Sequence, residues 1–193
     1  MAGSPGAGKT EASKALLAEF GAKVLRLDID ELRTLLPGYT GGNAHLFQAG
    51  ANILLEKAHD LALDQRQSFI LDGTMANIDI AKRNIERSIR KKRTVQILFV
   101  YQQPEQAWEF VKAREKVEGR KVLPEIFVDQ YFSSRQTVNA LKSEFMKQIK
   151  VDLLIKNVDG STKKYHANVN QIDSYITDQY DPAELLKMVG CKY

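Results

Sequence analysis

The sequence has almost no cysteine and little histidine. Cys191 is the only cysteine among 193 residues, which excludes a disulfide framework and a cysteine metal site. The three histidines, His45, His59 and His166, are scattered without the spacing of metal ligands. We therefore interpret the histidines as structural or surface residues.

Long hydrophobic runs are also missing. No apolar stretch approaches the roughly 20 residues that span a bilayer, and nothing resembles a signal peptide, so we expect a cytoplasmic protein with no membrane partner. Hydrophobic residues at 44% and charged residues at 27% are typical of a soluble globular protein. The sequence shows no internal repeat, low-complexity segment or linker, which predicts a single domain over residues 1–193.

One motif near the start is complete. The segment GSPGAGKT fits the phosphate-binding pattern G-x-x-x-x-G-K-[ST], in which glycines let backbone N–H groups point at phosphate oxygens. Lys9 is expected to contact the β- and γ-phosphates, and Thr10 to offer its hydroxyl to Mg²⁺. The whole segment should cradle a nucleoside triphosphate: Gly3, Ser4, Pro5, Gly6, Ala7, Gly8, Lys9 and Thr10.

Strands and helices alternate along the chain, which predicts an α/β fold of the P-loop NTPase type, with a parallel sheet flanked by helices. The predicted strands cover residues 23–27, 68–71, 95–101 and 151–155. Residues 164–169 are expected to pair back as a C-terminal β-hairpin, followed by a helix over 182–189. A phosphate loop normally follows a buried strand, but only Met1 and Ala2 precede Gly3, so we expect the first strand to be missing or truncated.

Two long helices are predicted from apolar residues three and four positions apart. The first ends at about Leu63, and its buried face should carry Phe47, Gly50, Leu54, Ala58 and Leu61. The second begins at Leu123-Pro124, and its buried face should carry Val138, Leu141, Phe145 and Ile149.

The segment from 82 to 93 is strongly basic. It contains one acid, Glu86, and seven basic residues: Lys82, Arg83, Arg87, Arg90, Lys91, Lys92 and Arg93. A nucleic-acid surface is one interpretation. We favour a solvated helix face instead, with cations at the negative helix end and a buried stripe of Ile78, Ala81, Ile85 and Ile89.

Three acids follow predicted strands at the edge where a parallel sheet binds its ligand. Asp28 and Asp30 end the strand over 23–27, and one of them could accept the proton of an attacking hydroxyl. Alternatively, Asp30 only caps the next short helix. Asp72 follows the apolar run 69–71, where an acid can help hold Mg²⁺ or simply form an Asp-Gly turn.

Arg114 and Arg120 flank a break between two predicted helices. Arginines there suit a mobile lid over about 114–124 that neutralises charge on a transferring phosphoryl group, although both could be ordinary surface residues. A regulatory GTPase is disfavoured because no Asn-Lys-x-Asp segment is present, and the chain is short for a motor or recombinase. Kinases of small molecules fit best.

These features together resemble the zeta-toxin family of kinases, the enzymatic half of bacterial epsilon/zeta-type toxin–antitoxin pairs. The matching pieces follow the family's order to about residue 155: GSPGAGKT, LDIDELR, a helix with Glu56, ILDGT, AREK at Arg114 and GRKVLP at Arg120. The resemblance implies phosphorylation of the 3′-hydroxyl of UDP-N-acetylglucosamine with ATP or GTP and Mg²⁺. It also implies a small antitoxin that covers the nucleotide site.

The resemblance assigns a role to each matching position. It implies catalytic roles for Lys9, Asp30 (as general base), Arg114 and Arg120, metal ligation by Thr10 and Asp72, and substrate contacts by Asp28, Glu56, Asp72 and Thr74. Two features depart from the family pattern: Asp72 stands where many members have Glu, and residues 36–39 lack the histidine that many members have before the proline.

Other acceptors stay open as alternatives. Related kinases with the same core phosphorylate chloramphenicol, gluconate, adenylylsulfate or nucleic-acid ends, because acceptor specificity lies in variable loops. We do not favour nucleic acid for this chain. The non-enzymatic alternative is a module that binds a nucleotide without turning it over.

Overall fold

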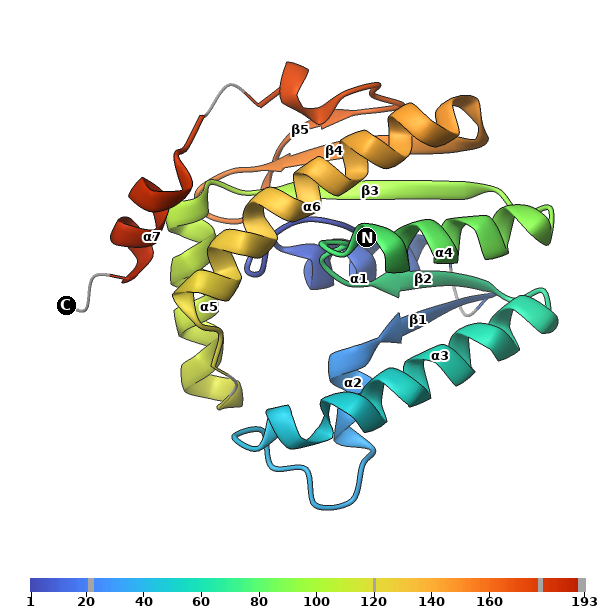
Figure 1. The fold of residues 1–193 in the computed structure, drawn as a ribbon, viewed down its shortest axis with the longest axis horizontal. Helices are drawn as coiled ribbons and strands as arrows, with labels where there is room; N and C mark the ends of the chain where they lie inside the picture. The colour runs from blue at the N-terminus through green and yellow to red at the C-terminus, as the bar shows by residue number, and fades with distance from the viewer. Residues whose placement is uncertain (21–22, 120, 177–178, 191–193) are drawn as a thin grey trace.

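The computed structural model describes residues 1–20, 23–119, 121–176 and 179–190, and Figure 1 shows its course. The helices are α1 (Lys9–Phe20), α2 (Ile29–Thr34), α3 (Gln48–Asp64), α4 (Ile78–Arg90), α5 (Pro104–Glu118), α6 (Pro124–Phe145) and α7 (Pro182–Gly190). The strands are β1 (Val24–Asp28), β2 (Ser68–Asp72), β3 (Val95–Tyr101), β4 (Ile149–Lys156) and β5 (Thr162–His166). Short 3₁₀ helices η2 (Ala44–Phe47), η3 (Met146–Gln148) and η4 (Ile172–Ser174) complete the assignment. Within the described ranges, no helix has the length and apolarity needed to cross a membrane.

The strands form two groups. Strand β1 pairs with β2 in parallel, and their last residues, Asp28 and Asp72, lie opposite each other. Strand β3 pairs with β4 in parallel, and β5 returns antiparallel to β4, with Leu153 opposite His166. Helices α4 and α6 lie on the near face in Figure 1 and α1 on the far face. The predicted parallel α/β fold and C-terminal hairpin are confirmed, although β5 begins two residues before the predicted hairpin strand.

The residues before the phosphate loop lie between the two groups of strands. The Ala2 N–H donates to the Leu98 carbonyl, and the Val100 N–H donates to the Ala2 carbonyl, each over 2.9 Å. On the other side, the Met1 nitrogen donates to the Leu71 carbonyl over 2.9 Å. Ala2 is fully buried and forms a single parallel bridge with Phe99 of β3.

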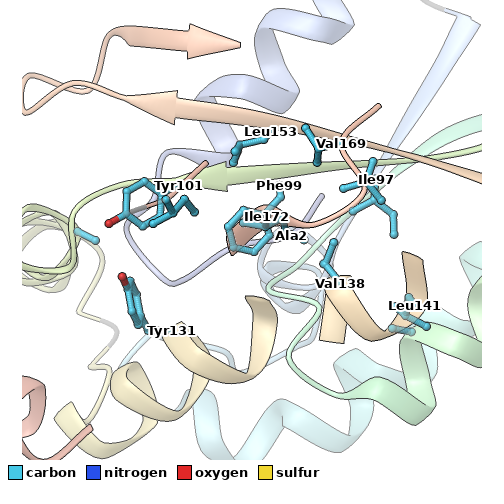
Figure 2. Close-up of a cluster of buried hydrophobic side chains, with 14 of the residues drawn as sticks. Ala2, Ile97, Phe99, Tyr101, Tyr131, Val138, Leu141, Leu153, Val169 and Ile172 are labelled. Carbon is cyan, nitrogen blue, oxygen red and sulfur yellow. The ribbon is translucent and has the colours of Figure 1, made fainter. Parts of the chain in front are cut away.

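The main core lies between the near face of the sheet and α6 (Figure 2). Alternate residues of β3, including Ile97 and Phe99, point to this face, as expected for a strand with a side-chain period of two. From α6, Val138 and Leu141 are fully buried against them, as predicted. Ile149, predicted on the same helix face, instead begins β4. The helix ends at Phe145 because Met146 takes a positive φ of 45°, which turns the chain.

Helix α3 buries a face that overlaps the predicted one only in part, since Phe47, Gly50, Leu54 and Ala58 are half-buried. Its buried residues are Ala51, His59, Ala62 and Leu63, whereas Leu61 is 58% exposed. The small alanines let the helix approach the strands closely, and the His59 ring packs edge-on to Phe69 of β2 with centroids 4.9 Å apart. The buried face of α3 is therefore set by how closely the helix packs on the strands, and not by which side of the helix is most apolar.

The basic helix α4 is paired with acids of its neighbours. Arg83 and Arg87 bind Glu56 of α3, Arg87 also binds Asp60, Lys91 binds Asp64, and Lys82 binds Glu144 of α6. Ala81 and Ile85 are buried as predicted, while Ile78 is 42% exposed, contrary to the predicted stripe, because it starts the helix at its solvent-facing end. These ion pairs agree with the interpretation of the segment as a solvated helix face.

We expect Leu153→Ala to lower the free energy of unfolding by about 3 kcal/mol, because Leu153 is fully buried in β4 and its truncation leaves a cavity. Denaturant unfolding followed by circular dichroism measures this change. The control is Leu25→Ala on β1, where 43% exposure predicts a loss below about 1 kcal/mol. Equal losses for the two variants would contradict this placement of the core.

Candidate active site

The phosphate loop fits its surroundings only with glycine. Gly3, Gly6 and Gly8 have φ values of 130°, 72° and 88°, a region that other residues rarely adopt. A Cβ at Gly3 would lie 2.3 Å from the Val100 carbonyl oxygen, and one at Gly6 would lie 2.0 Å from the Ala107 carbonyl oxygen. The loop is therefore held directly against β3 and α5, and α1 begins at its end.

Lys9 folds back over this loop. Its ammonium donates to the carbonyl oxygens of Gly3, at 3.0 Å, and Ser4, at 2.6 Å. Burial lowers the pKa of Lys9 to about 8, and the negative charge of Asp72 opposes this shift. The site therefore keeps a cation at neutral pH, but one that loses its proton more readily than an ordinary lysine.

Asp28, the last residue of β1, and Asp30, in the first turn of α2, make different contacts. Asp28 caps α2, because its Oδ1 accepts the Asp30 N–H over 2.8 Å. Burial raises the pKa of Asp28, and this same hydrogen bond opposes the rise. The alternative that Asp30 caps the helix is therefore wrong. Instead, Asp30 Oδ1 accepts a hydrogen bond of 2.8 Å from Arg33, which is itself buried, with 1% exposure.

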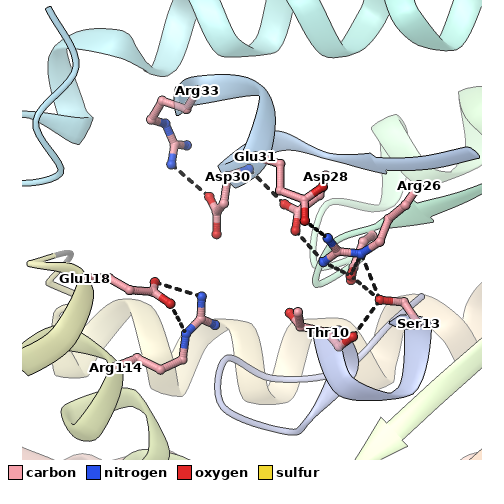
Figure 3. A network of polar contacts seen from close by, with 10 residues as sticks. Thr10, Ser13, Arg26, Asp28, Asp30, Glu31, Arg33, Arg114 and Glu118 are labelled. Atoms are coloured by element: carbon pink, nitrogen blue, oxygen red, sulfur yellow. Dashed lines mark hydrogen bonds and ion pairs between the residues drawn. The ribbon is translucent and has the colours of Figure 1, made fainter. Parts of the chain in front are cut away.

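Asp72 is bound from two sides. Its Oδ2 accepts from Arg26 Nη2 at 2.7 Å and from Ser13 Oγ at 2.9 Å. The Arg26 guanidinium also binds Asp28 at 2.5 Å, so it lies between the ends of β1 and β2 (Figure 3). These contacts pair the buried Asp72 carboxylate with a cation and connect it to β1 and α1.

Arg114 faces this group from α5. Figure 3 shows the Arg114 guanidinium and the Asp30 carboxylate facing each other, with Thr10 of α1 to their right. Arg114 is 46% exposed and forms an i,i+4 pair with Glu118, at 3.0 Å. Arg120, the other predicted lid arginine, lies outside the described residues.

A pocket of about 310 Å³ opens beside Arg33, the ion-pair partner of Asp30. It lies between the α2–α3 connection and the segment that joins α5 to α6. Its lining is polar and partly cationic: Arg33, Gly41, Gly42, Ala44, His45, Gln48, Gly119 and Lys121. Arg33 connects the pocket to the acid, because it binds both Asp30 and Gln48, each at 2.8 Å.

Two residues predicted to contact substrate, Thr74 and Glu56, lie in different places relative to the phosphate loop. The Thr74 carbonyl accepts the Gly3 N–H over 3.1 Å, so Thr74 adjoins the loop. Glu56 points to α4, where it binds Arg83 and Arg87. The structure shows no contact between Glu56 and the described residues of the loop, and its role as a substrate acid stays a prediction.

The sequence reasoning missed Arg26, Arg33 and Ser13. Arg26 carried a usable signal, since it interrupts the apolar pattern of a strand that ends in two acids, and a buried charge requires a partner. Arg33 gave no such signal, because its position in a short charged helix is equally typical of an exposed residue. His45, interpreted as structural or surface, lines the pocket.

A glycine-rich loop that runs from the centre of a parallel sheet into a helix, with acids ending the neighbouring strands, defines the class of P-loop proteins. The family within this class follows from sequence comparison. The model of the zeta toxin family matches residues 1–170, and the chain therefore belongs to this family.

The fold agrees with a solved relative. A structure described in work on the PezAT chromosomal toxin–antitoxin system of Streptococcus pneumoniae superposes with a TM-score of 0.70 at 17% identity. The match covers 98% of this chain and 81% of the other. At this identity the likeness concerns the fold alone. Comparison with curated protein sequences gives no match.

We expect Gly6→Ala to weaken nucleotide binding by at least about tenfold, because strain of about 1–3 kcal/mol and the clash with the Ala107 carbonyl must displace the loop. Equilibrium titration with a fluorescent nucleotide measures the affinity. Gly190→Ala is the control, since a Cβ there meets nothing within 4 Å. A Gly6→Ala protein with unchanged affinity would contradict the role of this loop.

Nucleotide affinity should depend on the protonation of Lys9. With a pKa of about 8, the ammonium is present below this pH and is lost above it, so affinity should be flat to about pH 7.5 and then fall. The fall should approach about tenfold per pH unit once the neutral amine dominates. Titrations from pH 6.5 to 9.5 test this, and Lys9→Arg should show no such fall because guanidinium keeps its proton. A flat wild-type profile would disagree with this assignment.

Proposed function

We propose that this zeta-toxin family member is a kinase that transfers the γ-phosphoryl group of ATP or GTP to a sugar hydroxyl. The observation that carries the proposal is the convergence of Asp30, Arg114 and Thr10 beside the phosphate loop (Figure 3). The charges of Arg114 and Asp30 also act on the buried Lys9 ammonium. Membership of the family supports a nucleotide co-substrate. The single domain, with a lid over about 114–124, is part of the proposal.

On the acceptor side, Asp30 is the general base. Arg33 holds the Asp30 carboxylate in place by a 2.8 Å ion pair, and a carboxylate can accept a proton from a hydroxyl in hydrogen-bond reach. Asp28 does not compete for this role because it is committed to the helix cap. The two acids that the sequence could not separate therefore have distinct functions.

On the phosphate side, the loop N–H groups, the N-terminus of α1 and Lys9 bind the nucleotide. Arg114 can then neutralise charge on the transferring group. Its exposed pair with Glu118 contributes only about 0.3–0.5 kcal/mol, so exchanging that carboxylate for a phosphate oxygen costs little. Arg120 is proposed to act with it.

The family implies Mg²⁺, and the donor atoms here fit it. Asp72 and the Thr10 hydroxyl supply oxygen ligands, which are the kind that Mg²⁺ prefers. Asp72 Oδ1 accepts no hydrogen bond from the described residues, while Oδ2 accepts from Arg26 and Ser13. When bound, the ion would neutralise phosphate charge.

For the acceptor we propose UDP-N-acetylglucosamine, phosphorylated on its 3′-hydroxyl. The polar pocket carries Arg33 and Lys121, and a cationic lining suits the diphosphate of a sugar nucleotide. Asp28, Glu56 and Thr74 are proposed as further substrate contacts. The absence of a histidine before Pro37 makes other acceptors the alternative.

A small antitoxin is the proposed protein partner, acting in the cytoplasm by covering the nucleotide site. Support comes from the family and from the solved relative, which was studied as part of a toxin–antitoxin system.

We expect the purified chain with Mg²⁺ and ATP or GTP to phosphorylate UDP-N-acetylglucosamine, detected by mass spectrometry. Asp30→Asn should keep nucleotide affinity but lose about 10²–10⁴-fold in turnover, because the general base is removed. The matched control is Asp64→Asn on α3, whose carboxylate only pairs with Lys91 on the exposed side of the protein. A fully active Asp30→Asn enzyme would rule out the proposed base. Turnover only with a different hydroxyl acceptor would correct the acceptor and keep the kinase.

A further inference from the structure

Arg26 is a buried cation inside the sheet. It lies on β1 opposite Ile70 of β2, and its side chain is only 5% exposed. Within the described chain, its ionic partners are the acids Asp28, Glu31 and Asp72. A buried guanidinium has a large desolvation cost, which close geometry with its partners must offset. The free energy of the buried guanidinium therefore depends on the geometry of its hydrogen bonds and not on its charge alone.

The two oxygens of Asp72 have different surroundings. Oδ2 accepts three hydrogen bonds, from Arg26 Nε at 3.0 Å, from Arg26 Nη2 at 2.7 Å and from Ser13 Oγ at 2.9 Å. Oδ1 accepts none from the part of the chain that the structure describes. A carboxylate that could otherwise rotate about its last bond is thus fixed through one oxygen, and the other is left for a ligand.

The same contacts tie Asp72 to the helix that carries Thr10. Ser13 lies one turn after Thr10 on α1, and its Oγ is 2.9 Å from the Thr10 carbonyl oxygen. Arg26 Nε is also 2.9 Å from Ser13 Oγ, which closes the network between β1, β2 and α1 (Figure 3). The position of Asp72 relative to the loop helix therefore depends on Arg26.

We propose that Arg26 is a positioning residue, which holds Asp72 by Oδ2 so that Oδ1 is presented to the divalent cation of the bound nucleotide. The inference rests on the proposed function, since it assumes a metal–nucleotide complex at this loop. A lysine would supply the charge but not the two parallel N–H groups, so Arg26→Lys separates the effect of charge from the effect of hydrogen-bond geometry. Residues that orient a metal ligand typically change metal affinity by about 10–100-fold when removed.

The test is a Mg²⁺ titration of nucleotide binding by the full chain, with a fluorescent ATP analogue as probe. In Arg26→Lys and Arg26→Gln, the half-saturating Mg²⁺ concentration should rise at least about tenfold. Affinity for the metal-free nucleotide should stay within about twofold of wild type, since Arg26 does not touch the loop. Mn²⁺ bound with the nucleotide, measured by electron paramagnetic resonance, should weaken in parallel.

Two further variants sharpen the result. Ser13→Ala removes one of the three hydrogen bonds to Oδ2 and should raise the half-saturating Mg²⁺ concentration in the same direction, but less. Arg93→Lys is the matched control, because Arg93 binds the Gln67 carbonyl and stacks on Phe69 without an acid partner among the described residues. It should leave the metal dependence unchanged.

Three results would overturn the inference. Unchanged metal dependence in Arg26→Lys, together with a lower melting temperature, would make Arg26 purely structural. A lower half-saturating concentration would mean that Arg26 competes with the metal. Nucleotide binding by wild type that ignores Mg²⁺ would reject the proposed metal site as well, which distinguishes the two failures. If Arg26→Gln does not fold, Arg26→Lys and Ser13→Ala decide the question, because both keep the buried acids next to a cation.

Discussion

The structure depends on the backbone hydrogen bonds of the two residues that precede the phosphate loop. Strands β2 and β3 are not paired with each other among the strands assigned, and Met1 and Ala2 lie between them, bonded to both sides. This short segment joins the two halves of the sheet and fixes the origin of the loop. Gly3 and Gly6 then let the loop lie against β3 and α5 at distances that no side chain would allow.

The polar residues beside the start of the phosphate loop form two groups. Register places Asp28 opposite Asp72, and α2 turns Asp30 toward the space that Arg114 faces. Each acid then has its own cationic partner, Arg26 for Asp72 and Arg33 for Asp30. Because buried charges cost free energy unless they are paired, these arginines stabilise the two acids in their positions. The pair of Arg114 with Glu118 is exposed to solvent and therefore weak.

Much of this could be predicted from sequence because the signals were local. The phosphate loop needs consecutive residues of defined type, and strand β3 is apolar except for Gln96. The errors arose where packing overrode pattern. Leu61 is more apolar than Ala62, yet α3 turns its small residues to the strands, since close approach there gains more than burial of one leucine. Ile149 continued a helical spacing, but a positive φ at Met146 ended the helix before it.

The sequence by itself determined the nucleotide loop, the order of strands and helices and the acids that end two strands, because each depends on neighbours in the chain. Only the tertiary structure decided which acid caps a helix and which faces the site. It also decided that Arg26 binds Asp72, and that acids of α3 pair with the basic helix. These choices depend on which side chains meet across β1, β2, α1 and α3, and distance along the chain carries no information about such contacts.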